Sequence, residues 1–180
     1  MIKAIDYDGA RSAEGIVQTG LEKLEKFGFI PDIDQLTTPQ QYKETCEESG
    51  RTCVVVFLPN MYDSSAKERN AYLEIVKKAS TVGRGKPINF LWAQGGDFFE
   101  YEEKLGMSFG FPALLVVNYN KKKYAVMRSS FDNEAIRTYL NRVLIGSESF
   151  YDLPKVIPSI KTVEPWDGND LVQEPTSDDL

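Results

Sequence analysis

Residues 53–58, CVVVFL, form a continuous run of β-branched and apolar residues with no polar alternation. A run of this length and composition indicates a strand that is covered on both faces of a sheet. Two similar runs follow, INFLWA at residues 88–93 and ALLVVNY at residues 113–119. We therefore expect three buried strands at the centre of the fold.

Helices are expected between and after these strands. Thr38 and Pro39 begin a short helix that runs to about Glu48. A longer helix ends near residues 83–85, and its expected apolar face consists of Tyr72, Ile75, Val76 and Ala79. Asp97 is expected to cap a third helix, which runs through Leu105. Apolar residues recur at helical spacing in a last helix, capped by Asp132: Ile136, Tyr139, Leu140, Val143 and Leu144.

Two weaker strands complete the pattern. Residues 33–36 are a brief extended segment, and residues 123–127 follow a turn that favours antiparallel pairing with the strand before it. From Ile33 onward the order is β-α-β-α-β-α-β-β-α. This order predicts an α/β fold with a mixed sheet covered by helices on both faces.

The composition excludes several classes of function. The 180 residues carry a net charge of -6, which argues against nucleic acid as a partner. Histidine is absent, so Ser-His-Asp and Cys-His catalysis and His-ligated metals are excluded. No apolar run is long enough to predict a membrane span or an export signal. We expect no metal site and no cofactor.

Several segments together resemble a known family. Phe111-Pro112, directly before a buried strand, resembles the cis-proline loop of thioredoxin-like folds. The whole of residues 33–170 resembles the non-catalytic C-terminal domain of protein disulfide isomerases that have two catalytic thioredoxin domains and one redox-inactive domain. The segments that carry this resemblance are CEESGRTCVVVFLPN, RNAYLEIVKKAS, GFPALLVVN, SFDNEAIRTYLNRVL and, as the most specific one, EPWDG.

The resemblance implies a division of the chain into four parts. Residues 1–28 resemble the last strand and helix of a preceding thioredoxin domain, and residues 29–32 are a linker. Residues 33–146 are the thioredoxin-like non-catalytic domain, and residues 147–180 are an extended acidic tail.

The resemblance also implies what this domain does. Catalytic domains of the family carry a C-x-x-C motif after the first central strand, but here residues 60–65 read NMYDSS. We therefore expect a redox-inactive domain of the endoplasmic reticulum lumen that binds unfolded or misfolded client polypeptides, or a lumenal chaperone, during oxidative folding. In the parent protein, disulfide exchange belongs to other domains.

The two cysteines leave three alternatives open. A turn separates Cys46 from Cys53 and could bring their α-carbons within bridging range. By analogy with an oxidising compartment, they form a structural disulfide; otherwise they are two buried thiols, or a redox pair that makes the domain an enzyme.

The fold that the resemblance implies would bring two loops together. A flexible methionine and several aromatic residues would then converge and offer a surface for unfolded polypeptide, although the same residues could simply pack the loops on the core. These client-binding candidates are Met61, Tyr62, Met107, Phe109, Phe111 and Pro112.

The end of the chain is acidic, with six carboxylates and no basic residue from Glu164 to Leu180. We interpret it as a solvated tail, with a low-affinity calcium-binding module as an alternative. Residues 177–180, SDDL, partly match a lumenal retention signal. Trp166 is a candidate for an anchor that holds the tail on the domain.

Overall fold

The computed structural model describes residues 12–17, 32–107 and 109–172. The chain divides into two compact units, residues 1–31 and residues 32–180. Within the first unit, residues 13–17 are helical and the Ser12 hydroxyl accepts a hydrogen bond from the Gly15 N–H. The rest of that unit, which carries most of the predicted strand and helix of a preceding domain, lies outside the described residues.

The second unit is built on a mixed sheet of six strands. They are β1 (Asp34–Gln35), β2 (Thr52–Leu58), β3 (Ile88–Gln94), β4 (Ala113–Asn118), β5 (Lys123–Val126) and β6 (Tyr151–Asp152), in the order β1-β3-β2-β4-β5-β6. The first three are parallel, and β4, β5 and β6 each pair antiparallel with the strand before them in that order. The sequence did not predict β6.

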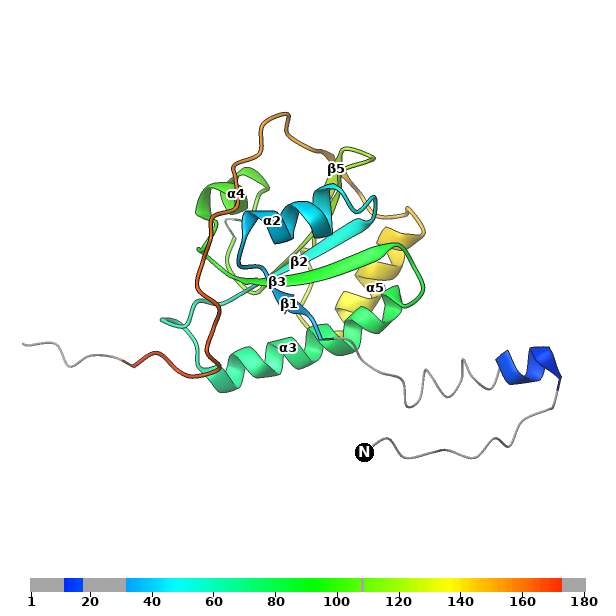
Figure 1. Cartoon of the computed structure of the whole chain (residues 1–180), viewed down its shortest axis with the longest axis horizontal. Coiled ribbons are helices and arrows are strands. Elements are labelled where there is room, and N and C mark those ends of the chain that lie inside the picture. Colours follow the sequence, from blue (N-terminus) through cyan, green and yellow to red (C-terminus); the bar gives the residue numbers. More distant parts are fainter. Residues whose placement is uncertain (1–11, 18–31, 108, 173–180) are drawn as a thin grey trace, which may run out of the picture. The chain divides into compact units, whose positions relative to one another are not determined.

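Helices cover both faces of this sheet, which confirms the predicted architecture (Figure 1). On one face lie α3 (Ala66–Ser80), followed by the 3-10 turn η2 (Thr81–Gly83), and α5 (Asn133–Leu144). On the other face lie α2 (Pro39–Tyr42), which continues into the π-helical turn η1 (Lys43–Glu47), and α4 (Phe99–Lys104).

Alternate side chains of β2 pack in two separate hydrophobic cores. Val54, Val56 and Leu58 pack with α3 and α5, whereas Val55 and Phe57 pack with α2 and α4. This division follows from the two-residue period of a strand, and it explains why a strand buried on both faces has no polar alternation.

Two details differ from the sequence prediction. Asp97 does not cap α4, whose N-cap is Phe98 without a side-chain hydrogen bond. The Asp97 carboxylate instead accepts a hydrogen bond from the Gln94 amide, 3.0 Å away. In α3 the buried face is formed by Leu73, Val76 and Ala79 together with Arg69, while the expected Tyr72 and Ile75 are only partly buried.

The segment after α5 is ordered against the domain as far as Val172. We call residues 160–172 the strap. Ile160 is buried at its start, the Val163 N–H donates to the Thr37 carbonyl, and the Asp170 carboxylate accepts from the Ala66 N–H at the start of α3. The strap therefore runs past β1 to the N-terminal end of α3 (Figure 1). None of the described helices is long and apolar enough to cross a membrane.

Candidate functional site

The loop between β2 and α3 holds residues 60–65, where the resemblance seen in the sequence would place a C-x-x-C motif. It closes through its own hydrogen bonds: the Asn60 side chain accepts from the Tyr62 N–H at 3.0 Å, and the Asn60 carbonyl accepts from the Asp63 N–H at 2.9 Å. Ser65 then starts α3 with a reciprocal capping box to Glu68. The loop contains no cysteine, so it presents no thiolate at the helix N-terminus.

The six client-binding candidates fall into two groups. Tyr62 and Phe109 are 83% and 47% exposed, and Phe111 and Pro112, joined by a cis peptide bond, are partly buried. Met61 and Met107 are only 6% and 1% exposed. These two methionines pack in the domain, so the surface offers aromatic and proline side chains rather than methionine.

The turn at Gln94-Gly95 contacts the two loops that carry Tyr62 and Phe109, the exposed client-binding candidates. The Gln94 amide oxygen accepts from the Met61 N–H at 3.3 Å, and the Asn60 amide approaches the Gly95 carbonyl. On the other side, the Phe111 ring packs directly over Gly95, where an added Cβ would overlap it. Gly95 therefore allows the close approach of Phe111.

Arg69 is the most unusual side chain of this region, because its residue is only 1% exposed. Its Nη2 donates to the Pro59 carbonyl at 2.8 Å and to the Gln94 amide oxygen at 2.7 Å, whereas its Nε has no partner in the described residues. Burial lowers the pKa of the guanidinium, and the nearby Asp97 carboxylate opposes that shift. Burial likewise raises the pKa of Asp97.

Two tryptophans enclose this guanidinium. Its central carbon lies 5.6 Å from the ring centroid of Trp92 and 5.0 Å from that of Trp166. The two indoles meet edge to face, with centroids 6.2 Å apart. Trp166 thus holds the strap on the domain, as the sequence suggested.

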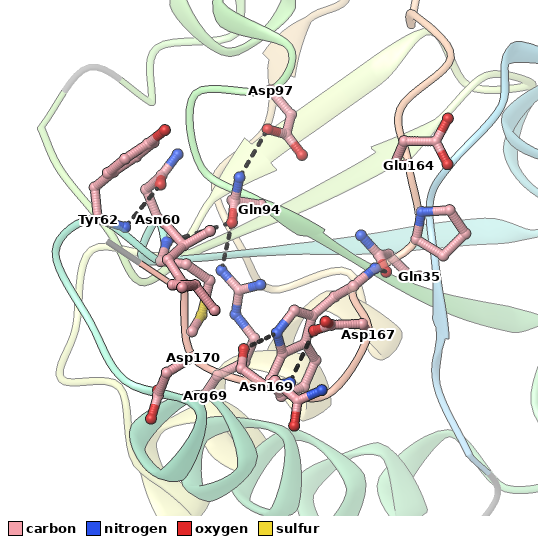
Figure 2. A pocket seen from close by; sticks show the side chains of 15 residues that line it. Gln35, Asn60, Tyr62, Arg69, Gln94, Asp97, Glu164, Asp167, Asn169 and Asp170 are labelled. Carbon is pink, nitrogen blue, oxygen red and sulfur yellow. Dashed lines mark hydrogen bonds between the residues drawn. The ribbon is translucent and has the colours of Figure 1, made fainter. Parts of the chain in front are cut away.

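A cavity of about 500 Å³ lies between the strap and the domain, and we call it the strap groove. Figure 2 shows the Arg69, Gln94 and Asp97 side chains in a row of hydrogen-bonded groups at its floor. The lining residues from the domain are Gln35, Asn60, Met61, Tyr62, Arg69, Gln94 and Asp97, and those from the strap are Glu164, Pro165, Trp166, Asp167, Asn169, Asp170, Leu171 and Val172.

The two cysteines lie apart from this groove. Cys46 in η1 and Cys53 in β2 are joined by a disulfide, with α-carbons 5.0 Å apart, and they are 1% and 0% exposed. They belong to the core that packs under α2 and α4. The bond therefore ties η1 to the central strand, and both cysteines are buried.

Within the described residues, no three acidic or cysteine side chains are grouped so that they could hold a metal ion. The candidate retention signal at residues 177–180 lies outside the described residues. Glu102 is a buried carboxylate, 3% exposed, but it accepts from the Gly96 and Phe98 N–H groups and so shapes the loop before α4.

Sequence reasoning missed Arg69, Glu102 and the groove itself. One signal for Arg69 was available: it stands four residues before Leu73 and seven before Val76, in register with the apolar face of α3. A charged residue in such a position indicates either that the buried apolar face of the helix ends there or that the charged group itself is buried and functional. Nothing comparable in the sequence points to Glu102.

Comparisons with known proteins agree with this geometry. A family model described as PDIA6-like, C-terminal thioredoxin-like domain matches residues 22–148. Protein disulfide-isomerase A6 of Mus musculus and that of Homo sapiens are each 34% identical over 178 residues, which cover 98% of this chain and 40% of each relative. Protein disulfide isomerase-like 2-3 of Oryza sativa subsp. japonica is 34% identical over 165 residues, 91% of this chain and 37% of that protein.

The chain spans about two fifths of the length of these curated relatives. The family match covers most of the strands and helices described above, so the resemblance seen in the sequence and its thioredoxin-like fold are confirmed. The chain belongs to the family of PDIA6-like C-terminal thioredoxin-like domains of protein disulfide isomerases.

Proposed function

We propose that this domain binds client polypeptide in the lumen of the endoplasmic reticulum, as part of a protein disulfide isomerase, and does not itself exchange disulfides. The observation that carries the proposal is that Tyr62 and Phe109 expose large aromatic side chains, while the loop of Tyr62 contains no thiol. The lumenal location is supported by the family and by the buried disulfide, the form that cysteines take in an oxidising compartment.

Redox inactivity is supported by the position of the cysteines. Disulfide exchange needs a thiolate that can reach the sulfur of the partner, in a setting that lowers the thiol pKa. The chain has two cysteines, and Cys46 and Cys53 are bonded to each other beneath the surface. Neither lies at the N-terminus of α3, where the family's chemistry would need it.

Client binding is supported by the surface that surrounds this loop. Tyr62 and Phe109 offer large apolar areas with few rotatable bonds, which bind polypeptide with little loss of entropy. Phe109 also carries the Arg128 guanidinium 4.4 Å above its ring centroid, so this patch has a cationic edge. Such a surface recognises apolar and aromatic groups without a strict sequence.

The binding test uses reduced, S-carboxymethylated α-lactalbumin, which stays unfolded, titrated into the domain with fluorescence anisotropy as the readout. We expect the double variant Tyr62→Ala/Phe109→Ala to bind at least five-fold more weakly than the wild type. Tyr151→Ala, which removes an aromatic side chain of 62% exposure from β6, is the matched control and should bind as the wild type does. Equal affinities for all three proteins would contradict the proposal, and a surface for a folded chaperone would then be sought.

The redox test counts thiols by alkylation and intact mass after equilibration in a series of glutathione buffers. We expect the Cys46–Cys53 bond to persist well below the lumenal potential of about -180 to -210 mV. Insulin reduction by the domain should stay at the rate of the buffer alone. Interconversion of the cysteines near the lumenal potential would instead show that the domain has redox chemistry of its own.

A further inference from the structure

The strap forms one wall of the strap groove and contacts the domain wall as a bound peptide would. The Val163 N–H donates to the Thr37 carbonyl at 2.9 Å, and the Trp166 N–H donates to the Gln35 side chain at 2.8 Å. Gln35 belongs to β1, the edge strand of the sheet. An extended segment of another polypeptide can make the same kind of backbone contacts along such an edge.

The chemistry of the groove selects an aromatic side chain at the place of Trp166. Trp92 and Trp166 meet edge to face, and the Arg69 guanidinium lies 5.0 Å from the Trp166 ring centroid. Both contacts depend on a π face, so an aliphatic side chain would lose them.

Arg69 also gives the groove a preference for negative charge. Among the described residues, the Asp97 carboxylate acts on the guanidinium from a distance, no carboxylate lies within salt-bridge distance of it, and its buried Nε lacks an acceptor. The strap brings three carboxylates to the lining of the same cavity, namely Glu164, Asp167 and Asp170. An aromatic residue flanked by carboxylates therefore complements the buried cation.

The strap does not fill the groove. About 500 Å³ remains beside Trp166, between the strap and Arg69, Gln94 and Asp97. The space leaves room for an occupant larger than the strap.

We propose that the domain wall of the strap groove is a binding site for an extended polypeptide segment with an aromatic residue flanked by carboxylates, and that the strap is its intramolecular occupant. A client segment of this kind displaces the strap, and its ring takes the place of Trp166 against Trp92 and Arg69. This inference rests on the proposed function, since it names the class of client segment.

The first experiment supplies the strap as a separate peptide. A fluorescein-labelled peptide of residues 160–172 is titrated into the wild type and into Trp166→Ala, with anisotropy as the readout. We expect at least ten-fold tighter binding to Trp166→Ala, whose aromatic position is empty. A peptide with alanine at its tryptophan should bind that variant at least ten-fold more weakly, and one with its three carboxylates changed to amides at least three-fold more weakly.

A second variant keeps the test decisive if Trp166→Ala does not fold. Asp170→Ala removes the strap's contact with the Ala66 N–H and leaves both tryptophans in place. Loosening of the strap should raise the affinity for the labelled peptide at least three-fold. Failure of the folded variants to bind the peptide more tightly than the wild type overturns the inference and makes Trp166 a purely structural anchor.

The client is tested by competition. Carboxymethylated α-lactalbumin should bind Trp166→Ala at least three-fold more tightly than the wild type, and the unlabelled strap peptide should displace it. If the probe binds all proteins equally and the peptide does not compete, the inference is overturned while the proposed function stands. If the peptide binds but the probe binds no variant, the proposed function fails, and with it the claim that a client displaces the strap.

Discussion

Arg69 connects the sheet, the loop after β2 and the strap through one guanidinium. It donates to the Pro59 carbonyl and to Gln94, and it lies against Trp92 and Trp166. A buried cation is costly unless its donors are satisfied and its charge is compensated. In this site the compensation comes from the Pro59 carbonyl, the Gln94 amide oxygen, the indole rings and the nearby Asp97 carboxylate, without a salt bridge.

Replacement of Arg69 tests how much the region depends on it. Arg69→Ala removes a buried side chain and leaves the Pro59 carbonyl without its donor, so we expect a loss of about 3 kcal/mol in the free energy of unfolding. Lys78→Ala, at an exposed position of the same helix, is the control and should change it by less than about 0.5 kcal/mol. Urea unfolding followed by tryptophan fluorescence measures both. A loss below about 1 kcal/mol for Arg69→Ala would contradict this account.

Three tyrosines beneath α2 share a chain of hydroxyl hydrogen bonds. The Tyr42 hydroxyl lies 2.6 Å from that of Tyr101 and 2.9 Å from that of Tyr119. Burial raises the pKa of all three phenols, that of Tyr119 to about 12. The folded state therefore holds these protons more tightly than the unfolded state, whose tyrosine pKa is about 10.

This difference predicts an alkaline limit to stability. The contribution of these tyrosines is fully present below about pH 10, and it is lost as the pH rises through the folded pKa of about 12 for Tyr119. Tyr119→Phe should cost about 1 kcal/mol at pH 7 and flatten the fall between pH 10 and 12. Urea unfolding across this pH range measures the effect, with the exposed Tyr62→Phe as the control at pH 7. The same pH dependence in Tyr119→Phe and the wild type would refute the assignment.

At the scale of elements, α4 organises the loop that forms the floor of the groove. Its Glu102 carboxylate accepts from the Gly96 N–H at 2.9 Å and from the Phe98 N–H at 3.0 Å. These bonds fix the turn that follows β3, and with it Gln94 and Asp97. Burial raises the pKa of Glu102, while the two backbone bonds oppose that shift.

Removal of this carboxylate should loosen the turn. Glu102→Ala leaves two backbone N–H groups without their acceptor, so we expect a loss of about 2 to 3 kcal/mol in unfolding free energy. The neighbouring Glu103→Ala is the matched control, because Glu103 is exposed, and it should be nearly neutral. Thermal unfolding by circular dichroism compares the two. Equal midpoints for both variants would show that the turn does not depend on Glu102.

At the scale of the whole molecule, the strap is part of the domain rather than an appendage. It spans the edge of the sheet at β1 and reaches α3, and Ile160 enters the core on the side of α2 and α4. The family model ends at residue 148, before the strap begins, although the mouse relative aligns over 98% of this chain. The compact unit of residues 32–180 therefore extends beyond the part of the chain that the family model matches.

The contribution of the strap to the stability of the domain can be tested at two aliphatic residues, one in the strap and one before it. Ile160 is 5% exposed and Val156 is 76% exposed, only four residues apart. Ile160→Ala should lose about 2 to 4 kcal/mol of unfolding free energy, because it leaves a cavity, whereas Val156→Ala should lose less than about 0.5 kcal/mol. Urea unfolding measures both. A near-neutral Ile160→Ala would mean that the strap contributes little to the stability of the domain.

The central strands and the last helix could be predicted from the sequence because their local composition indicates which residues are buried. Residues 53–58 are apolar on both faces, and α5 buries Ile136, Tyr139, Leu140 and Val143 at the predicted helical spacing. Asp132 caps that helix as expected. In these segments the spacing of the apolar residues follows the period of the strand or helix itself. The prediction therefore needs no knowledge of contacts with distant residues.

The sequence by itself determined the class of the fold and the absence of thiols after β2, and it made Trp166 a candidate anchor, since these depend on residue identity and local order. Only the tertiary structure decided that Met61 and Met107 are buried while Tyr62 is exposed, and that Arg69 lies between two indoles. The physical reason is that these features come from contacts between residues far apart in the chain. Trp166 and Gln35 are hydrogen-bonded although they are 131 positions apart, and no local sequence pattern indicates such a pair.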